Sequence, residues 1–167
     1  MSTERILGID SGLNVTGYGI IEKKNSILQV VEAGIIRGGS AKRPLPDRLD
    51  ELYTNITEII RSLGPTTMAL EELYSHYERP RTAIIMGHAR GVICLAAGHC
   101  QIPIAHYAAT KIKKVHTGNG RAPKHQMQIA VRNQLRLDEI PEPPDVADAL
   151  AIAMCHHFAI HSPQLGL

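Results

Sequence analysis

The sequence has no tryptophan, a single phenylalanine, and three cysteines that form no Cys-x-x-Cys pair. An odd number of scattered cysteines argues against a disulfide framework and predicts a reducing, cytoplasmic location. Long apolar runs are missing, and no basic segment followed by a hydrophobic one opens the chain, so we expect neither a transmembrane helix nor a signal peptide. The length of 167 residues predicts a single domain over residues 1–160 and a short C-terminal tail over 161–167.

Two adjacent segments each carry charged side chains of a single sign, the first positive and the second negative. Residues 111–136 contain no aspartate or glutamate, and residues 138–148 contain no lysine or arginine. This pattern predicts a phosphate-binding face beside a metal-binding pocket. The alternative is that the charges form solvated helix faces, which we favour for Arg132 and Arg136 because they lie at helical spacing. The other basic residues of the first segment are Lys111, Lys113, Lys114, Arg121 and Lys124.

The apolar pattern predicts an α/β domain with a mixed five-stranded sheet. The first three strands are joined by short connections and are expected to be antiparallel, and parallel strands then extend them. The predicted strands are 5–10, 16–23, 27–37, 67–71 and 102–107. The predicted helices are 46–63, 81–97 with a stop at Gly98, 109–115, 124–136 and 144–160.

Four carboxylates stand where predicted elements end or begin. Asp10 and Glu71 close two strands that should be parallel neighbours, so both side chains are expected at one sheet edge. Asp145 and Asp148 share a face in the first turn of the last helix, where they could instead serve only to complement the helix dipole. Asp10 and Glu71 have no helix to cap. A cluster of these acids would be costly without a cation, so the sequence predicts a divalent metal site.

Histidines are numerous, with nine in the chain, and several fall near its end. Cys155, His156, His157 and His161 together suggest a zinc site. The alternative is a polar rim at the end of a helix. We favour this alternative because no matching pair of ligands stands elsewhere in the sequence.

Short motifs in five parts of the chain carry a family resemblance. They are ILGIDSG at 6–12 with TGYGII at 16–21, ALEELY at 69–74, GHARG at 87–91, YAA at 107–109 and DVADALA at 145–151. The first alone would also suit actin-like ATPases and sugar kinases. Together, in collinear order over almost the whole chain, the five resemble the RuvC-type Holliday-junction resolvases.

This resemblance implies a ribonuclease-H-like nuclease domain and a homodimer that makes paired, symmetric nicks across four-way DNA junctions in recombination and repair. It also implies magnesium dependence, with a branch-migration helicase as a partner. The implied catalytic and metal-binding acids are Asp10, Glu71, Asp145 and Asp148. Lys113 and Lys124 match basic residues near the scissile strand, and Tyr74 matches an aromatic residue that follows the second acid.

An all-carboxylate site suits magnesium, for which manganese could substitute, and two ions about 4 Å apart would serve phosphodiester hydrolysis. We expect Asp10 to bridge the ions, with Glu71 and Asp148 each completing one site. Asp145 would be a ligand or would orient the water. Lys113 or Lys124 would counter charge on the phosphate, and Lys111, Lys114 and Arg121 would add DNA affinity.

Several questions stay open at this level. Tyr74 is expected to stack on an unpaired base, with ordinary packing as the alternative, and the roles of Tyr77, Arg79 and Arg81 are undecided. The helix at 81–97 carries surplus apolar residues that could form a dimer interface or pack in the core. An actin-like nucleotide binder and a non-catalytic junction-binding module are the competing functions.

Overall fold

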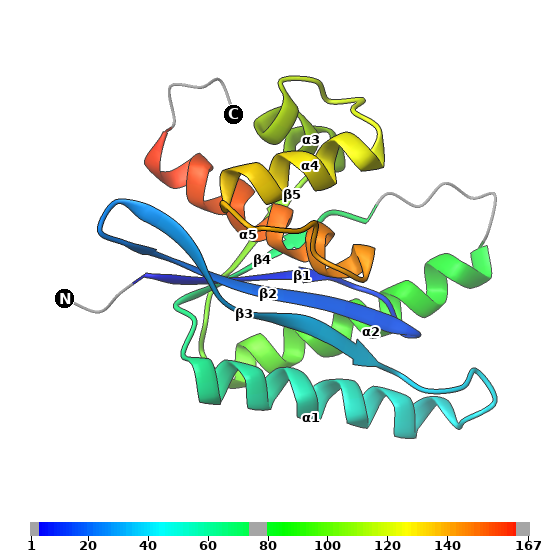
Figure 1. Cartoon of the computed structure of the whole chain (residues 1–167). Coiled ribbons are helices and arrows are strands. Elements are labelled where there is room, and N and C mark those ends of the chain that lie inside the picture. Colours follow the sequence, from blue (N-terminus) through cyan, green and yellow to red (C-terminus); the bar gives the residue numbers. More distant parts are fainter. Residues whose placement is uncertain (1–3, 74–79, 163–167) are drawn as a thin grey trace.

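The computed structural model describes residues 4–73 and 80–162. These residues form one five-stranded sheet in the order β3-β2-β1-β4-β5 (Figure 1). The first three strands are antiparallel, whereas β4 runs parallel to both β1 and β5, as the sequence predicts. The strands are β1 (Arg5–Asp10), β2 (Val15–Lys24), β3 (Ile27–Arg37), β4 (Thr67–Glu71) and β5 (Ile104–Tyr107).

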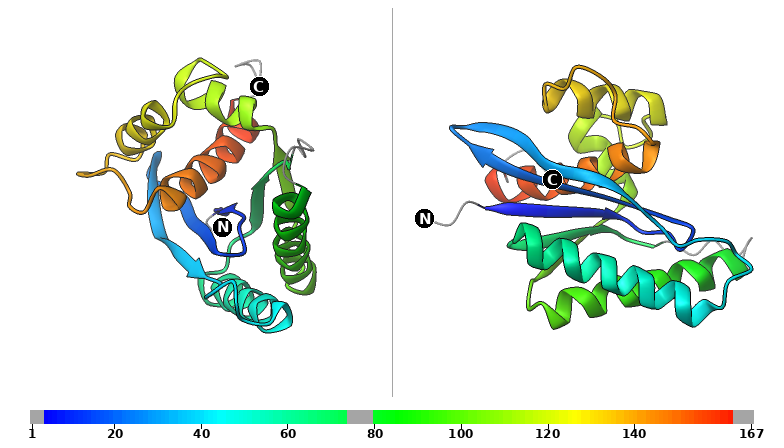
Figure 2. Two further views of the ribbon diagram at one scale, coloured as in Figure 1. Left: turned by 90° about the vertical axis from the view of Figure 1, so that its right-hand side faces the viewer. Right: turned by 60° about the horizontal axis from the view of Figure 1, so that its bottom comes forward.

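Helices cover both faces of the sheet (Figure 2). α1 and α2 lie on one face, and α5 lies on the other beneath α3 and α4. Side chains of β1 divide between the two layers: Ile6 packs in the core on the α5 side, while Leu7 and Ile9 pack on the side of α1 and α2. The helices are α1 (Leu45–Leu63), α2 (Pro80–His99), α3 (Ala109–Thr117), α4 (Lys124–Gln134) and α5 (Pro144–His161).

α5 lies unusually close to the sheet because glycines line its path. A Cβ atom on Gly8 of β1 would come 2.1 Å from the carbonyl oxygen of Ala149, and one on Gly17 of β2 would come 2.1 Å from that of Asp145. Neither distance leaves room for a side chain. The two glycines therefore let the backbone at the start of α5 rest directly on β1 and β2.

Four predicted boundaries are wrong by two residues. α3 ends at Thr117 rather than at residue 115, and the other three differ for a local reason. β5 begins at Ile104 rather than at residue 102, because Pro103 has no N–H for the sheet, although its carbonyl accepts from the Met68 N–H at 2.9 Å. α2 continues through Gly98 to His99, and the left-handed residue that follows is Gln101. α4 ends at Gln134, and Arg136 has a φ of 54°, so Arg132 and Arg136 do not share a helix face.

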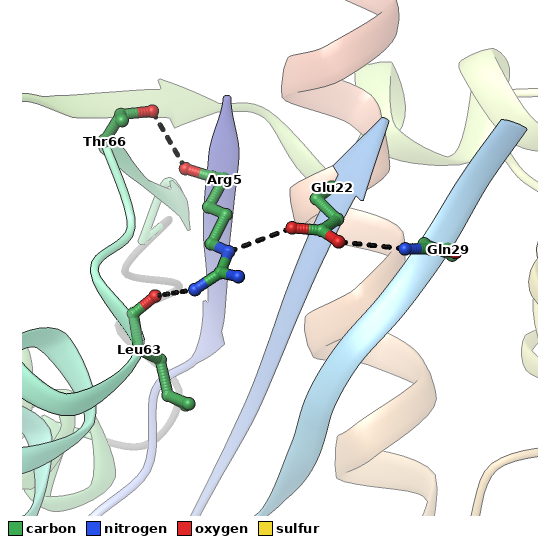
Figure 3. Close-up of polar contacts among 5 residues, drawn as sticks. All are labelled: Arg5, Glu22, Gln29, Leu63 and Thr66. Carbon is green, nitrogen blue, oxygen red and sulfur yellow. Dashed lines mark hydrogen bonds and ion pairs between the residues drawn. The ribbon is translucent and has the colours of Figure 1, made fainter. Parts of the chain in front are cut away.

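A polar network fixes the edge of the sheet at which β1 begins (Figure 3). The Arg5 guanidinium donates to Glu22 of β2 at 3.0 Å and to the Leu63 carbonyl at the end of α1 at 2.6 Å. Gln29 of β3 donates to the same Glu22 carboxylate at 2.8 Å. Three strands and one helix are thus held together at the end of the sheet opposite Asp10.

Cys94, Cys100 and Cys155 are free thiols, as expected from their spacing. Among the helices of the described residues, none combines the length and apolar character needed to cross a bilayer.

Candidate active site

Two parallel strands deliver the first two acids. In the β1–β4 register Ile9 pairs with Leu70, so the next residues, Asp10 and Glu71, end neighbouring strands at the same sheet edge. Both residues are partly buried and line one hollow beside the start of α2. Asp10 and Glu71 therefore lie side by side at one sheet edge, as the sequence predicts.

α5 delivers the other two acids across the face of the sheet. Its first turn holds Asp145, whose backbone rests on Gly17, the residue paired with Asp10 in the β1–β2 register. One turn later, Asp148 lines the same cavity as Glu71. Close packing of this helix on glycine thus brings its aspartates to the ends of β1 and β4.

Burial and mutual repulsion both disfavour the ionised forms of these carboxylates. Burial, followed by the charges of Asp148, Asp145 and Glu71, raises the pKa of Asp10 from 3.8 to about 7, against a smaller lowering by Lys124. Burial and the Asp148 charge likewise raise the pKa of Glu71. The folded chain therefore concentrates negative charge at a place where it destabilises its own ionised side chains.

Two predicted lysines lie among the acids. Lys124, the first residue of α4, places its Nζ 3.0 Å from Asp148 Oδ2, and this ion pair raises the Lys124 pKa. Lys113 of α3 lines the cavity that Glu71 and Asp148 also line, which has a volume of about 220 Å³. Its charge partly offsets the rise in the Glu71 pKa. Cations from two separate helices thus face the four carboxylates.

The remaining predicted contacts to DNA, and the residues whose roles the sequence leaves undecided, have varied surroundings. Lys111 holds its Nζ 5.2 Å from the centre of the Tyr107 ring, a cation–π arrangement. Lys114 and Arg121 are exposed, and Arg81 is exposed at the start of α2. Tyr74, Tyr77 and Arg79 lie outside the described residues.

Arg90 of α2 is a functional candidate to which the sequence assigned no role. Its guanidinium donates to the backbone carbonyl of Glu71 and lies 2.7 Å from Nδ1 of His106 on β5. Its charge also lowers the pKa of Glu71. One signal was visible: within residues 82–99 it is the only Asp, Glu, Lys or Arg. A lone charge in an otherwise apolar helix needs a partner, which here is the end of β4.

The donor set fits a hard divalent cation. All four converging acids offer carboxylate oxygens, and the described residues that line the two hollows include no cysteine or histidine. Burial and the neighbouring carboxylates raise the Asp10 pKa, which is a cost that a bound cation would offset. Residues that could hold such an ion are Asp10, Glu71, Asp145 and Asp148.

A mixed sheet in this order, with carboxylates from two adjacent strands and a crossing helix, defines a ribonuclease-H-like nuclease. The family model described as "Crossover junction endodeoxyribonuclease RuvC" matches residues 6–156. A RuvC from Rhodopirellula baltica is 52% identical over 162 residues, covering 97% of this chain and 90% of the relative. The chain therefore belongs to the RuvC family of crossover junction endodeoxyribonucleases.

Solved structures agree with this assignment. Thermus thermophilus RuvC in complex with a Holliday junction substrate matches with a TM-score of 0.88 and 28% identity, covering 96% of each chain. The yeast mitochondrial Holliday junction resolvase Ydc2 matches with a TM-score of 0.64 and 11% identity, covering 97% of this chain and 86% of that one. The second likeness concerns the fold alone.

Proposed function

We propose that this protein resolves four-way DNA junctions by magnesium-dependent hydrolysis of phosphodiester bonds. The observation that carries the proposal is the meeting of Asp10, Glu71 and Asp148 with Lys124 in a chain of the RuvC family. A relative of the same fold has been solved with a Holliday junction substrate. Family membership favours a nuclease over the nucleotide-binding alternative.

The four acids would hold two Mg²⁺ ions, with Mn²⁺ as a substitute. Asp10 would contribute to holding both ions, while Glu71 and Asp148 would each contribute to one. Bound metal of this kind activates a water and stabilises charge on the attacking and leaving oxygens. Asp145 stands one turn before Asp148 and either adds a ligand or orients the water.

The protein's own cations handle the charge of the DNA strand. Lys124 reaches Asp148 and Lys113 lines the same cavity, so both are within the region that a scissile phosphate would enter. There they offset the negative charge that grows on the phosphate as the bond breaks. Lys111, Lys114 and Arg121 extend this cationic surface, which makes binding sensitive to salt. Stacking by Tyr74 on an unpaired base stays a prediction.

Paired incision needs two active sites related by a two-fold axis, and hence a homodimer. α2 is the element best suited to the interface, because it exposes apolar side chains beside its buried ones. Ile84 is 61% exposed, and Ile85 and Leu95 are also exposed.

A branch-migration helicase as partner, and a cytoplasmic location, stay predictions.

The test of this function is cleavage of a synthetic mobile four-way junction compared with linear duplex of the same sequence. We expect symmetric nicks in the junction when Mg²⁺ is present, and intact duplex under the same conditions. Tight binding of the junction without metal-dependent nicking would support the non-catalytic alternative instead. Equal cleavage of both DNAs would contradict structural selectivity.

The dimer is tested by placing a charge on the exposed face of α2. Ile84→Asp should yield a monomer by sedimentation and should convert paired incisions into single nicks. The matched control is Ile27→Asp, because Ile27 is also an exposed isoleucine but lies on β3. Ile84→Asp protein that still sediments as a dimer and makes paired incisions would place the interface elsewhere.

A further inference from the structure

A second cluster of metal-binding side chains lies at the opposite end of the sheet from the four acids. Glu4 immediately precedes β1, and His157 and His161 lie one turn apart near the end of α5. Figure 1 shows the start of β1 and the end of α5 on the same side of the molecule. The cluster is therefore built from two segments that are far apart in the sequence.

The three side chains converge closely enough to share one ion. One carboxylate oxygen of Glu4 and one nitrogen from each imidazole all lie within 4.8 Å of one another. Glu4 Oε2 is 2.8 Å from His161 Nε2, and the His157 and His161 ring centres are 4.4 Å apart. Small side-chain adjustments would bring all three donors to bonding distance of a common centre.

His157 is the member that an ion pair alone leaves unexplained. Its side chain is buried, with 6% of the residue exposed, and it lines a surface hollow together with His161. A small cation could therefore reach the His157 ring from this hollow at the same place where it meets His161.

Two neighbours on α5 take no part in this cluster. Cys155 is fully buried in the core, and burial raises the pKa of its thiol to about 11. His156 instead forms a 2.7 Å hydrogen bond with the Tyr107 hydroxyl. Of the four residues that suggest zinc in the sequence, only His157 and His161 therefore belong to this cluster, and its third member is Glu4.

We propose that Glu4, His157 and His161 form a Zn²⁺ site that ties the start of β1 to the end of α5. Two imidazoles and one carboxylate are a typical zinc set when a water fills the fourth position, and imidazole favours zinc over magnesium. The site is separate from the four acids, because Asp148 and His157 lie roughly 13 Å apart along the axis of α5. Its role is to stabilise the fold, since it is remote from the scissile phosphate.

The proposal is tested by zinc binding to the 167-residue protein with excess Mg²⁺ and in an Asp10→Asn background, so that the four-acid site does not contribute. Competition with a chromophoric chelator should show one Zn²⁺ per chain. His161→Ala and Glu4→Gln, both at partly exposed positions, should weaken binding by about tenfold or more. His88→Ala, an exposed histidine on α2, is the matched control and should bind zinc normally.

Two further measurements distinguish Zn²⁺ bound at this site from Zn²⁺ bound non-specifically to the surface. Zinc should raise the melting temperature of the control protein but not of His161→Ala, whose fold is checked by circular dichroism without metal. Co²⁺ in place of zinc should give the absorption bands of a four-coordinate ion. Absence of stoichiometric zinc binding, or equal zinc affinity in the control and His161→Ala, would overturn the proposal.

Discussion

The Asp10 carboxylate destabilises the metal-free fold, so replacing it with a neutral isostere should stabilise the protein. Raising the Asp10 pKa from 3.8 to about 7 corresponds to about 4 kcal/mol for an ionised side chain at alkaline pH. Asp10 is partly exposed, so solvent screening reduces the measurable gain to about 2 kcal/mol. Asp10→Asn removes this cost while leaving the shape of the side chain almost unchanged.

The sign of the pH dependence follows from proton binding. Between about pH 4 and pH 7 the folded state of the natural protein holds a proton on Asp10 that the unfolded state has lost, so its stability falls as pH rises. The advantage of Asp10→Asn should therefore be near zero at pH 4, grow through this window and level off above pH 7.

Urea unfolding with a chelator present, repeated across this pH range, measures the difference directly. Asp50→Asn, at an exposed position of α1, should show no comparable pH dependence. Added Mg²⁺ should restore stability to the natural protein more than to Asp10→Asn. An Asp10→Asn protein that is less stable at pH 8, or a stability difference that does not change with pH, would refute the electrostatic reasoning.

Three other substitutions probe the surroundings of the acids. Lys124→Ala should slow single-turnover junction cleavage about 100-fold, whereas Lys114→Ala should change mainly the salt dependence of binding; equal rate losses would contradict this. Gly8→Ala should lower the free energy of unfolding by about 3 kcal/mol in urea, because its Cβ meets the α5 backbone, while Gly87→Ala in open space should be neutral or slightly stabilising. Arg90→Leu should move the acid limb of the pH–rate profile to higher pH, because the Arg90 charge lowers the pKa of Glu71 and the variant lacks that charge. An unmoved profile would leave Arg90 a purely structural role.

The sequence predicted the fold well because its strands and helices follow local rules. The strands at 5–10, 27–37 and 67–71 have the predicted boundaries, since each is an apolar run bounded by turn residues. The errors occur where a local signal competes with tertiary structure. Gly98 looked like a helix stop, yet a Cβ there would meet nothing, and the helix continues past it to His99.

The site was predictable where topology alone determines it. Parallel neighbouring strands bring Asp10 and Glu71 together from any correct strand order. Contacts that depend on how separate elements dock could not be predicted in the same way. The Lys124–Asp148 ion pair requires α4 to lie over α5, and Glu4 meets His161 across 157 positions of sequence. Neither spacing nor composition carries that information.

On the function proposed above, the four carboxylates are needed to cut junction DNA and are not needed to recognise it. The most direct measurement compares Asp10→Asn with the natural protein in junction binding and in magnesium-dependent cleavage of the same DNA. We predict that Asp10→Asn binds the four-way junction at least as tightly, since it removes a negative charge, but makes no detectable incision. Undiminished cleavage by Asp10→Asn would contradict the assignment of the active site.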